Sequence, residues 1–262
     1  MQPTLDEITS WSHEAGKILR TGFGQVHQVT HKSAIDLVTE MDKQAEDYLL
    51  GQIKTTFPDH SILSEEIGSI AGDADHQWYV DPLDGTVNYA HGIPIFCISI
   101  AYSFKGHLIQ AVINSPMMDE VFTAERGQGA FLNGQCLHVS KTTDVIQSLL
   151  VTGFPYDVQT SKRNNLDNFE HFTKNSQGVR RFGSAAIDLA YVAAGRFEGY
   201  WELGIKPWDI AAGVLLVEEA GGMVSDLEGG SNYFTPPYAL IAANPALHHI
   251  ILNQLNKNTP PS

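Results

Sequence analysis

The sequence predicts a mixed α/β fold in which β-sheets are sandwiched between layers of helices. Three observations favour it. Apolar residues recur at helical spacing near both ends of the chain, in residues 4–22 and 245–255. Alternating or continuous apolar runs, typical of strands, follow one another between residues 61 and 124. Beyond residue 149, strand-like and helix-like segments alternate. Because the first half contains so many consecutive strands, a strictly doubly wound sheet is disfavoured.

Two helices are predicted before the first strand. The helical pattern of residues 4–22 stops at Gly22. A polar connector follows, and Thr39 is predicted to cap a second helix that ends at Phe57-Pro58. These two helices supply apolar stripes that can cover one face of a sheet.

The strand-rich region begins with residues 61–66, which end in two acids. Residues 67–76 are predicted to be a turn-rich loop, and an apolar strand starts at Trp78. Turn residues then separate three further runs, which predict an antiparallel meander: 95–104, 107–115 and 119–124.

The second half is predicted to alternate strands with helices. Ser184 is expected to cap one of these helices and Gly195 to close it. The predicted strands are 149–152, 197–202 and 238–242, and the predicted helices are 160–174, 185–194, 207–220 and 245–255. No linker or repeat interrupts the sequence, so we expect one domain over residues 1–262, built from two closely packed halves of about 1–140 and 141–262.

Composition excludes several classes of protein. With 43% hydrophobic and 18% charged residues, the chain is typical of soluble globular proteins. Its formal net charge of -14 argues against nucleic acid or an anionic membrane as the main partner. An acidic enzyme can still bind a phosphate ester if divalent cations neutralise the site. No signal sequence or apolar run long enough to cross a bilayer is visible, so a cytoplasmic location is expected.

The strongest local signal lies in residues 78–89, WYVDPLDGTVNY. An apolar run ends in Asp81, a proline forces a turn, and Asp84 follows three residues after Asp81. We interpret this as a buried strand that delivers two aspartates to a turn. Gly85 and Thr86 are then expected to open a short helix or nest with outward-facing N–H groups.

These residue types suit phosphate chemistry. Two carboxylates on one rigid turn can bind Mg²⁺, with Asp81 bridging two ions while Asp84 and the Leu83 carbonyl each complete a site. The amides of Gly85 and Thr86 can hold phosphate oxygens. A metal pair beside a phosphate cradle can displace a phosphoryl group with water. The plain alternative is an ordinary strand-to-turn connection with two solvated aspartates.

Residues 207–220 provide a second signal. The predicted helix is apolar on every side and should therefore be buried. Asp209 lies in its first turn, so this carboxylate needs a partner or a cation, unless the helix N-terminus alone stabilises it. Gly213 would let the helix approach another backbone closely.

Two further acids are candidates for the same site. Glu65 ends a strand, as Asp81 does, and would reach the same cavity if the two strands are neighbours. Glu66 should point to the opposite face. Glu202 ends another strand and could accept a hydroxyl group of a polyol, although a surface acid in a turn explains it nearly as well.

Other catalytic chemistries find little support. The two cysteines, Cys97 and Cys136, lack metal-type spacing, so a thiolate metal site is excluded and a disulfide framework is disfavoured. No His-Glu-x-x-His pattern indicates zinc, and no Gly-x-Ser-x-Gly elbow indicates a serine hydrolase.

Taken together, these segments resemble the inositol monophosphatase family of metal-dependent phosphatases. Residues 78–89 are similar to the first signature of that family, and Trp208–Gly213 to its second. Glu65-Glu66, the Asp36–Asp42 segment and Gly183-Ser184-Ala185-Ala186 match in the same order, so the resemblance covers nearly the whole chain. It implies a layered α/β/α/β/α sandwich of the sugar-phosphatase type, inhibition by Li⁺ and a homodimer.

Carried over residue by residue, the resemblance implies a complete site. The implied ligands of two or three Mg²⁺ ions are Glu65, Asp81, the Leu83 carbonyl, Asp84 and Asp209. The implied catalytic residues are Glu65, Thr86 and Asp84, with Glu65 and Thr86 orienting the attacking water. Phosphate and the sugar or polyol would be bound by Gly85, Thr86, Gly183, Ser184, Ala185 and Glu202. Supporting residues around the ligands would be Lys32, Asp36, Asp42 and Glu66, although solvated connector charges explain the first three equally well.

The leading hypothesis is therefore Mg²⁺-dependent hydrolysis of a small phosphate monoester, with inositol 1-phosphate as the first choice of substrate. Family members also act on fructose 1,6-bisphosphate, histidinol phosphate or nucleotide 3′-phosphates. Residues 153–177 and 203–207, including Lys206, have no assigned role and lie where substrate is chosen. A phosphatase with an aspartyl nucleophile is a rival, but its two aspartates are usually two residues apart. A non-catalytic interaction or regulatory protein on the same fold is the alternative from another class.

Overall fold

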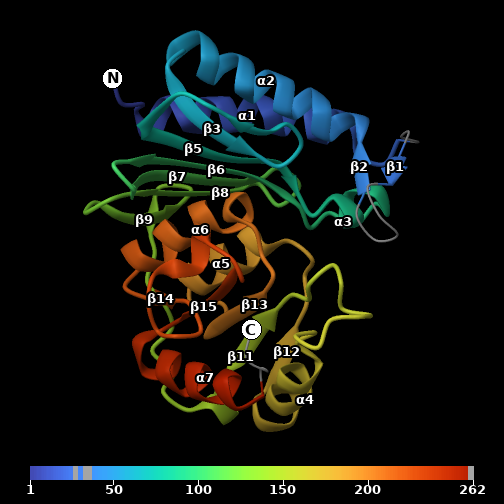
Figure 1. Cartoon of the computed structure of the whole chain (residues 1–262), viewed down its shortest axis with the longest axis vertical. Helices are drawn as coiled ribbons and strands as arrows, with labels where there is room; N and C mark the ends of the chain where they lie inside the picture. The colour runs from blue at the N-terminus through green and yellow to red at the C-terminus, as the bar shows by residue number, and fades with distance from the viewer. Residues whose placement is uncertain (26–28, 32–36, 259–262) are drawn as a thin grey trace.

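The computed structural model describes residues 1–25, 29–31 and 37–258. In these ranges the strands form an eight-stranded sheet, a five-stranded sheet and a separate two-stranded ladder. The two larger sheets, called here the large and the small sheet, alternate with three pairs of helices along the long axis of the molecule (Figure 1). The predicted α/β/α/β/α layering is confirmed.

Helices α1 (Leu5–Gly22) and α2 (Glu40–Thr56) cover the outer face of the large sheet. The side chain of Thr39 accepts hydrogen bonds from the backbone N–H groups of Met41 and Asp42, so the predicted cap is confirmed. Apolar residues of both helices, including Ile8 and Leu49, are buried against the sheet. The two-stranded ladder pairs β1 (Val29–His31) with β2 (Leu37–Thr39) just before α2.

The large sheet has the strand order β10-β9-β8-β7-β6-β5-β3-β4. Strands β5 to β9 pair antiparallel with their chain neighbours, which confirms the predicted meander, and β3 runs parallel to β5. Its strands are β3 (His60–Ser64), β4 (Gly68–Ile70), β5 (Asp73–Asp84), β6 (Cys97–Phe104), β7 (His107–Ser115), β8 (Glu120–Glu125), β9 (Gly129–Leu132) and β10 (Gln135–Cys136).

The predicted loop over residues 67–76 is wrong. Strand β4 pairs antiparallel with β3 in this segment, and β5 already begins at Asp73. The first residues of β5 are polar and exposed, so they carry no hydrophobic signal. Backbone pairing with β3 at Asp73 and with β6 at His76, rather than side-chain burial, holds them in a strand.

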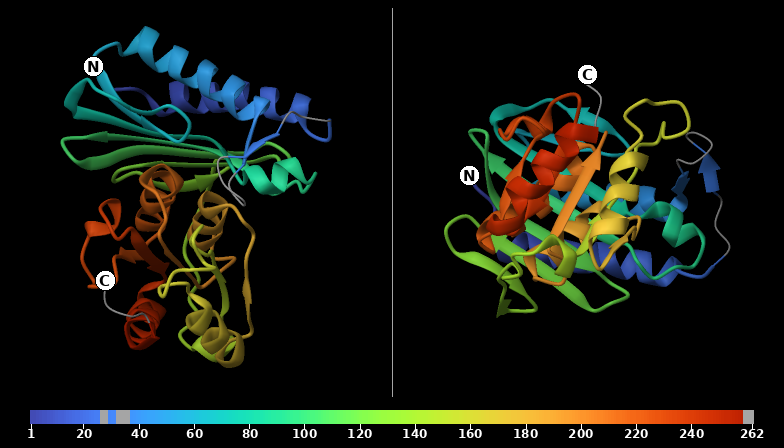
Figure 2. Two further views of the ribbon diagram at one scale, coloured as in Figure 1. Left: turned by 45° about the vertical axis from the view of Figure 1, so that its right-hand side comes forward. Right: turned by 90° about the horizontal axis from the view of Figure 1, so that it is seen from below.

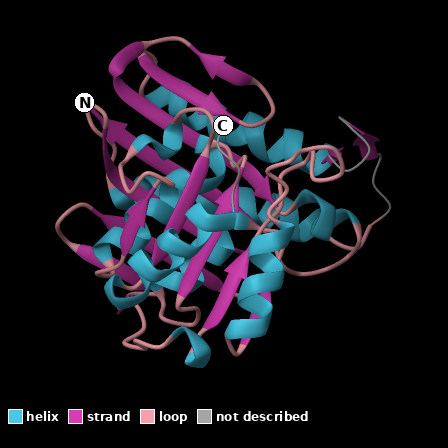
Figure 3. Ribbon diagram, turned by 60° about the horizontal axis from the view of Figure 1, so that its bottom comes forward, coloured by secondary structure: helices cyan, strands magenta, loops and turns pink. Residues whose placement is uncertain are grey.

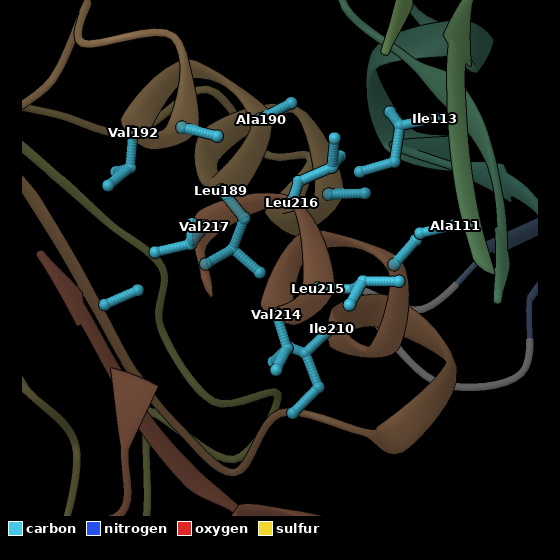
Figure 4. Packing of buried hydrophobic residues seen from close by; sticks show 14 of the residues in the cluster. Ala111, Ile113, Leu189, Ala190, Val192, Ile210, Val214, Leu215, Leu216 and Val217 are labelled. Carbon is cyan, nitrogen blue, oxygen red and sulfur yellow. The ribbon is translucent and has the colours of Figure 1, made fainter. Parts of the chain in front are cut away.

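Helices α5 (Ala185–Ala193) and α6 (Pro207–Glu219) lie between the two sheets. Residues 210–217 of α6 are all buried, as predicted for a helix that is apolar on every side. Figure 4 shows the core that the two helices share with β7, including Leu189, Leu215 and Ile113.

The small sheet has the strand order β12-β11-β13-β15-β14. Its central strand β13 pairs parallel with β11 and antiparallel with β15. The strands are β11 (Leu149–Thr152), β12 (Gly178–Arg180), β13 (Gly199–Leu203), β14 (Met223–Ser225) and β15 (Ala239–Ala243). Helices α4 (Leu166–Asn175) and α7 (Pro245–Asn258) cover its outer face (Figure 2), and Figure 3 shows the helices and strands by colour.

The short elements are α3 (Thr86–Ala90), η1 (Val145–Gln147) and η2 (Asn232–Phe234). Helix α4 starts at Leu166 rather than at the predicted residue 160. The side-chain amide of Asn165 bonds to Thr152 and to the Gly153 carbonyl, which holds the preceding segment in a turn. Among the described helices, none is both long enough and apolar enough to span a membrane.

Gly213 allows the close packing of α6 against α5. A Cβ atom at this position would lie 2.4 Å from the Cβ atom of Leu189, inside the contact distance of two carbon atoms. The predicted close approach is therefore confirmed, and it sets the spacing of the two central helices.

We expect Gly213→Ala to lower the free energy of unfolding by about 1–3 kcal/mol, because the added methyl group overpacks the core. Gly51→Ala is the matched control, since nothing lies within 4 Å of a Cβ atom at this position in α2. The control should be neutral or stabilising by about 0.4–1 kcal/mol. Urea titration of both variants measures the difference, and equal stability of the two would contradict the packing argument.

A cluster of aromatic rings surrounds His60 on the large sheet. Its ring stacks on His76 with centroids 4.1 Å apart and on Phe57 at 4.9 Å. The indole N–H of Trp78 donates to His60 Nδ1 at 3.1 Å, and an indole can only donate, so this nitrogen is unprotonated. Burial lowers the pKa of His60 and the neighbouring His76 lowers it further.

This histidine should make the protein less stable in weak acid. Because the folded-state pKa lies below the ordinary value of 6.5, the unfolded chain binds the proton first as pH falls. The N-terminal amine also lowers the pKa of His60, whereas a hydrogen bond with the Met1 backbone and the charge of Asp73 raise it. The free energy of unfolding should thus fall as pH drops below about 6.5.

His60→Asn keeps an acceptor near Nδ1 but cannot titrate in this range. Chemical denaturation of wild type and variant from pH 8 to pH 5 should therefore show a shallower loss of stability in the variant. Parallel curves would show that His60 does not contribute.

Candidate active site

The end of β5 carries the two aspartates of the first motif. Asp81 pairs with Ser99 of β6, and Asp84 pairs with Cys97, so Pro82 and Leu83 form an irregularity opposite a single residue. Asp81 is 1% exposed and Asp84 9%. The Leu83 N–H donates to Asp81 Oδ1 at 3.0 Å, which fixes this carboxylate on the bulge.

Glu65 lies directly beside this bulge. Strand β3 ends at Ser64, and the Glu65 N–H donates to the Val80 carbonyl at 3.2 Å, one residue before Asp81. The neighbouring strands that the sequence analysis required for Glu65 are therefore present. Its side chain is half-buried.

Asp209 reaches the same place from α6, which packs on the inner face of the large sheet. Ser99, the partner of Asp81, donates through its hydroxyl to the Trp208 carbonyl at 3.4 Å. Asp209 follows in the first turn of α6, and its Oδ2 accepts from the Lys206 N–H at 2.9 Å. The contact between β6 and α6 thus places Asp81 and Asp209 near each other, although 128 residues separate them in the chain.

The four acids influence one another strongly. Burial raises the pKa of Asp81 well above its ordinary value, and Glu65, Asp84 and Asp209 raise it further. Burial, followed by Glu65 and Asp84, also raises the pKa of Asp209. Burial raises the pKa of Asp84 to about 6, against the lowering effect of its hydrogen bonds. A divalent cation would relieve the repulsion between these carboxylates.

The donor set fits Mg²⁺, although it is not a closed coordination shell. Among the residues that the structure describes, no three His, Cys, Asp or Glu side chains already stand as a group that could hold a metal ion. Asp84 and Asp209 each turn an oxygen toward backbone N–H groups. Mg²⁺ keeps several waters and needs only one or two carboxylates directly, so these hard oxygen donors suit it by their chemistry.

Thr86 connects this cluster to α2. Its hydroxyl lies 3.0 Å from Asp42 Oδ1 and 3.0 Å from the Leu83 carbonyl oxygen, two acceptors for its single proton. Asp42 is fully buried and also accepts from the N–H and hydroxyl of Thr39. Burial raises the pKa of Asp42. Lys32 and Asp36, the other predicted supporting residues of this region, lie outside the described residues.

Helix α3 follows the aspartates directly, as predicted. Gly85 precedes it with a left-handed φ of 98°, and no side chain caps its first N–H groups. A Cβ atom at Gly85 would lie 2.9 Å from the Ile95 carbonyl oxygen, so this position requires glycine on both counts. The amides of Gly85 and Thr86 thus begin a helix beside Asp84.

Ser184 contacts a carboxylate of the cluster. It caps α5, is 1% exposed, and donates to Asp84 Oδ2 at 2.7 Å. The Ala186 N–H donates to the same oxygen at 2.7 Å. Of the neighbouring residues predicted to line the polyol pocket, Gly183 is exposed and Ala185 is buried. The Asn88 side chain donates to the Phe182 carbonyl at 2.7 Å and so joins α3 to this segment.

Glu202 lies half-buried on β13. The Tyr200 hydroxyl donates to its Oε2 at 2.6 Å, and the carboxylate rests against Gly153, where a Cβ atom would lie 2.0 Å from Oε2. Burial raises the pKa of Glu202 to about 7, Tyr200 lowers it, and Asp84 raises it. Asp84 and Glu202 therefore act on each other, which connects the polyol candidate to the acid cluster.

Sequence reasoning missed several residues of this region. Asp188 is 1% exposed in α5, and its Oδ1 has no hydrogen-bond partner among the described residues. Burial raises its pKa, followed by Glu202 and Asp84. An acid inside the apolar run Ala185–Ala193 was an available signal. Cys97 was also missed, and no signal in the sequence marked it; its buried thiol lies 3.6 Å from the Ser184 hydroxyl.

The arrangement combines acidic oxygen donors with the uncapped N–H groups at the start of α3 and with the Glu202 carboxylate, a candidate acceptor for polyol hydroxyls. Comparison with known proteins agrees with this chemistry. The inositol monophosphatase family profile matches residues 1–259. Nus factor SuhB of Pseudomonas aeruginosa is 42% identical over 271 residues, covering 100% of this chain and 99% of that protein. Inositol-1-monophosphatase of Mesorhizobium japonicum is 42% identical over 256 residues, covering 97% and 96%.

Solved structures give the same result. Inositol monophosphatase from Anabaena (Nostoc) sp. PCC 7120 matches with a TM-score of 0.88 at 42% identity, covering 98% of this chain and 96% of that one. An IMPase/NADP phosphatase complexed with Mg²⁺ and phosphate matches with a TM-score of 0.82 at 26% identity, covering 96% and 94%. The protein therefore belongs to the inositol monophosphatase family and is a metal-dependent phosphomonoesterase.

Proposed function

We propose that this protein hydrolyses a small polyol or sugar phosphate, with inositol 1-phosphate as the first choice, by attack of water beside bound Mg²⁺. One observation carries the proposal. Glu65, Asp81, Asp84 and Asp209 approach one another at the end of β5: Glu65, Asp84 and Asp209 each raise the pKa of Asp81, and Glu65 and Asp84 also raise that of Asp209. Buried acids that repel one another lower the stability of the fold. The same arrangement favours the binding of divalent cations, which neutralise the charges.

Two or three Mg²⁺ ions bound by Glu65, Asp81, Asp84, Asp209 and the Leu83 carbonyl would supply a polarised water and neutralise the developing charge. The residues of the chain do the positioning. Glu65 and the Thr86 hydroxyl orient the attacking water, and Asp42 fixes the direction of that hydroxyl. The amides of Gly85 and Thr86 hold phosphate oxygens at the start of α3. No covalent phosphoenzyme is formed.

Glu202 is proposed to select the alcohol part of the substrate. Its carboxylate is held by Tyr200 and Gly153, so it can accept a polyol hydroxyl in a defined direction. Gly183 and Ala185 are proposed to complete this pocket. Fructose 1,6-bisphosphate, histidinol phosphate and nucleotide 3′-phosphates are the alternative substrates for the same chemistry. Glu66 is half-buried and remains a proposed supporting residue. A homodimer, sensitivity to Li⁺ and a cytoplasmic location also remain proposals.

A regulatory role is the second candidate. One observation favours it, since relatives 42% identical to this chain carry the name Nus factor SuhB. The net charge of -14 disfavours direct binding to nucleic acid, so such a role would act through a protein partner. A screen of phosphate esters with Mg²⁺ separates the two functions. Release of phosphate from a polyol ester supports the phosphatase and ranks its substrates, whereas no release from any ester supports the regulatory role.

Asp84→Asn should abolish turnover while leaving the fold intact, because the amide oxygen can still accept from Ser184 but carries no charge for Mg²⁺. The loss of turnover should exceed the roughly 10–100-fold that removal of a supporting residue costs. Asp144→Asn, at an exposed cap of η1, is the matched control and should keep full activity. A normal rate in Asp84→Asn would remove this residue from the site.

Ser184→Ala tests whether Ser184 binds substrate, as the family resemblance implies, or holds Asp84, as its hydrogen bond suggests. In the second case the Mg²⁺ concentration for half-maximal activity should rise about 10–100-fold. The KM at saturating Mg²⁺ should then stay within about two-fold of wild type. Ser184→Thr keeps the hydroxyl, and Thr4→Ala removes a helix cap far from the site as a control for stability. A raised KM with an unchanged Mg²⁺ requirement would favour the substrate role.

A further inference from the structure

Glu46 is a buried acid in α2 that none of the roles above uses. It is 2% exposed. A single oxygen, Oε1, accepts three hydrogen bonds: from the Ser64 hydroxyl at 2.5 Å, from the Glu66 N–H at 3.2 Å and from the Ile67 N–H at 3.2 Å. These donors come from the end of β3 and the loop that follows it.

The donors lie on both sides of Glu65. Ser64 precedes it, and Glu66 and Ile67 follow it, so the carboxylate of Glu46 spans the backbone that carries the proposed metal ligand. The Glu65 N–H donates in another direction, to the Val80 carbonyl of β5. The loop is therefore held by α2 on one side and by the strand that ends in the aspartates on the other.

Side-chain burial does not hold this loop. Ile67 is 53% exposed, and Glu65 and Glu66 are only half-buried. Beyond the loop, Gly68 has a left-handed φ of 81° and β4 is a short edge strand. The hydrogen bonds to Glu46, together with the Glu65–Val80 bond and the pairing of Ser64 with Gly68, thus fix the backbone of this loop.

Holding α2 against the large sheet does not require this acid. Helix α2 already packs on the large sheet through Ala45, Leu49 and Ile53. Within the described ranges, no Lys, Arg or His side chain forms an ion pair with Glu46, and its hydrogen-bond donors are the neutral Ser64 hydroxyl and two backbone N–H groups. Burying a carboxylate among neutral groups is costly unless its hydrogen bonds are well made. Such a group rigidifies what it binds.

We propose that Glu46 is a positioning residue for Glu65: it fixes the loop 64–67 so that the Glu65 carboxylate faces Asp81 and Asp209. The inference rests on the proposed metal site and adds a residue to it. The side chain of Glu46 does not reach the ions itself. It acts through the direction of its neighbour, as residues behind metal ligands generally do.

The test measures Mg²⁺ binding directly and does not depend on activity. Glu46→Ala should raise the Kd for Mg²⁺, measured by isothermal titration calorimetry without substrate, by about 10-fold or more. Hydrogen exchange at the Glu66 and Ile67 amides should accelerate in the same variant, because both lose their acceptor. Glu46→Gln keeps one acceptor oxygen, and Ser64→Ala keeps the two amide bonds, so both should show smaller increases in Kd even if Glu46→Ala does not fold.

Asp226 offers a matched control. It is 4% exposed and accepts from the N–H groups of Glu228, Gly230 and Asn232 in the loop after β14, at the edge of the small sheet. Asp226→Ala removes the same kind of clamp from a loop that carries no proposed ligand. It should lower the melting temperature and leave the Kd for Mg²⁺ within about two-fold of wild type.

The outcomes separate the two proposals. If wild type binds Mg²⁺ and Glu46→Ala behaves as Asp226→Ala does, with a lower melting temperature and an unchanged Kd, then Glu46 only stabilises the fold. That result would overturn this inference. If wild type itself does not bind Mg²⁺, the metal site and the inference fail together. A selective increase in Kd for Glu46→Ala, graded through Glu46→Gln and Ser64→Ala, supports the positioning role.

Discussion

The repulsion among four carboxylates at the end of β5 is the constraint on which the rest of this structure depends. Glu65, Asp81, Asp84 and Asp209 are brought together in a largely buried place, where burial raises the pKa of the three aspartates and neighbouring acids raise those of Asp81 and Asp209 further. Such a cluster lowers stability in the absence of cations. The scaffold must therefore hold these acids from several directions at once, and the surrounding layers do so.

Backbone N–H groups hold the carboxylates of the three aspartates, Asp81, Asp84 and Asp209. The N-terminus of α5 donates to Asp84, the bulge after Asp81 donates to that aspartate, and the start of α6 donates to Asp209. Helix termini and bulges supply N–H groups with fixed directions. Because α5 and α6 pack closely through Gly213, the two helix N-termini that hold Asp84 and Asp209 keep a constant spacing. The central helix pair thus serves both the core and the site.

The sequence predicted those site residues that are charged but stand in an apolar stretch of the chain. Asp81 ends an apolar run, and Asp209 opens a helix that is apolar all round, so both acids stand out. Glu46 does not stand out, because its stretch of α2 is rich in charged residues and an acid there is expected to be solvated. Only the three-dimensional position of Ser64 and the following loop shows that Glu46 faces inward. Periodicity locates a helix face but not what lies against it.

The same limit explains the other differences. The start of β5 is polar and exposed, and its strand conformation depends on pairing with a distant segment that no local pattern encodes. Ser184 was predicted to cap α5, and it does, but its hydrogen bond to Asp84 depends on how β5 meets that helix. Propensity and capping are local, whereas the partner of a side chain is set by tertiary contacts.

Helix α5 suggests how substrate choice and metal binding are connected. Ser184 at its N-terminus contacts Asp84, and Asp188, one turn further on, lies near Glu202 on the evidence of their electrostatic interaction. Glu202 is itself held by Tyr200 from the small sheet. The acids of the proposed metal site belong mainly to the large sheet, and the proposed polyol acceptor belongs to the small one. Helix α5, with a polar residue in each of two successive turns, connects the two. Changes in the small sheet can therefore alter which alcohol is accepted while the carboxylates that bind the cations stay in place.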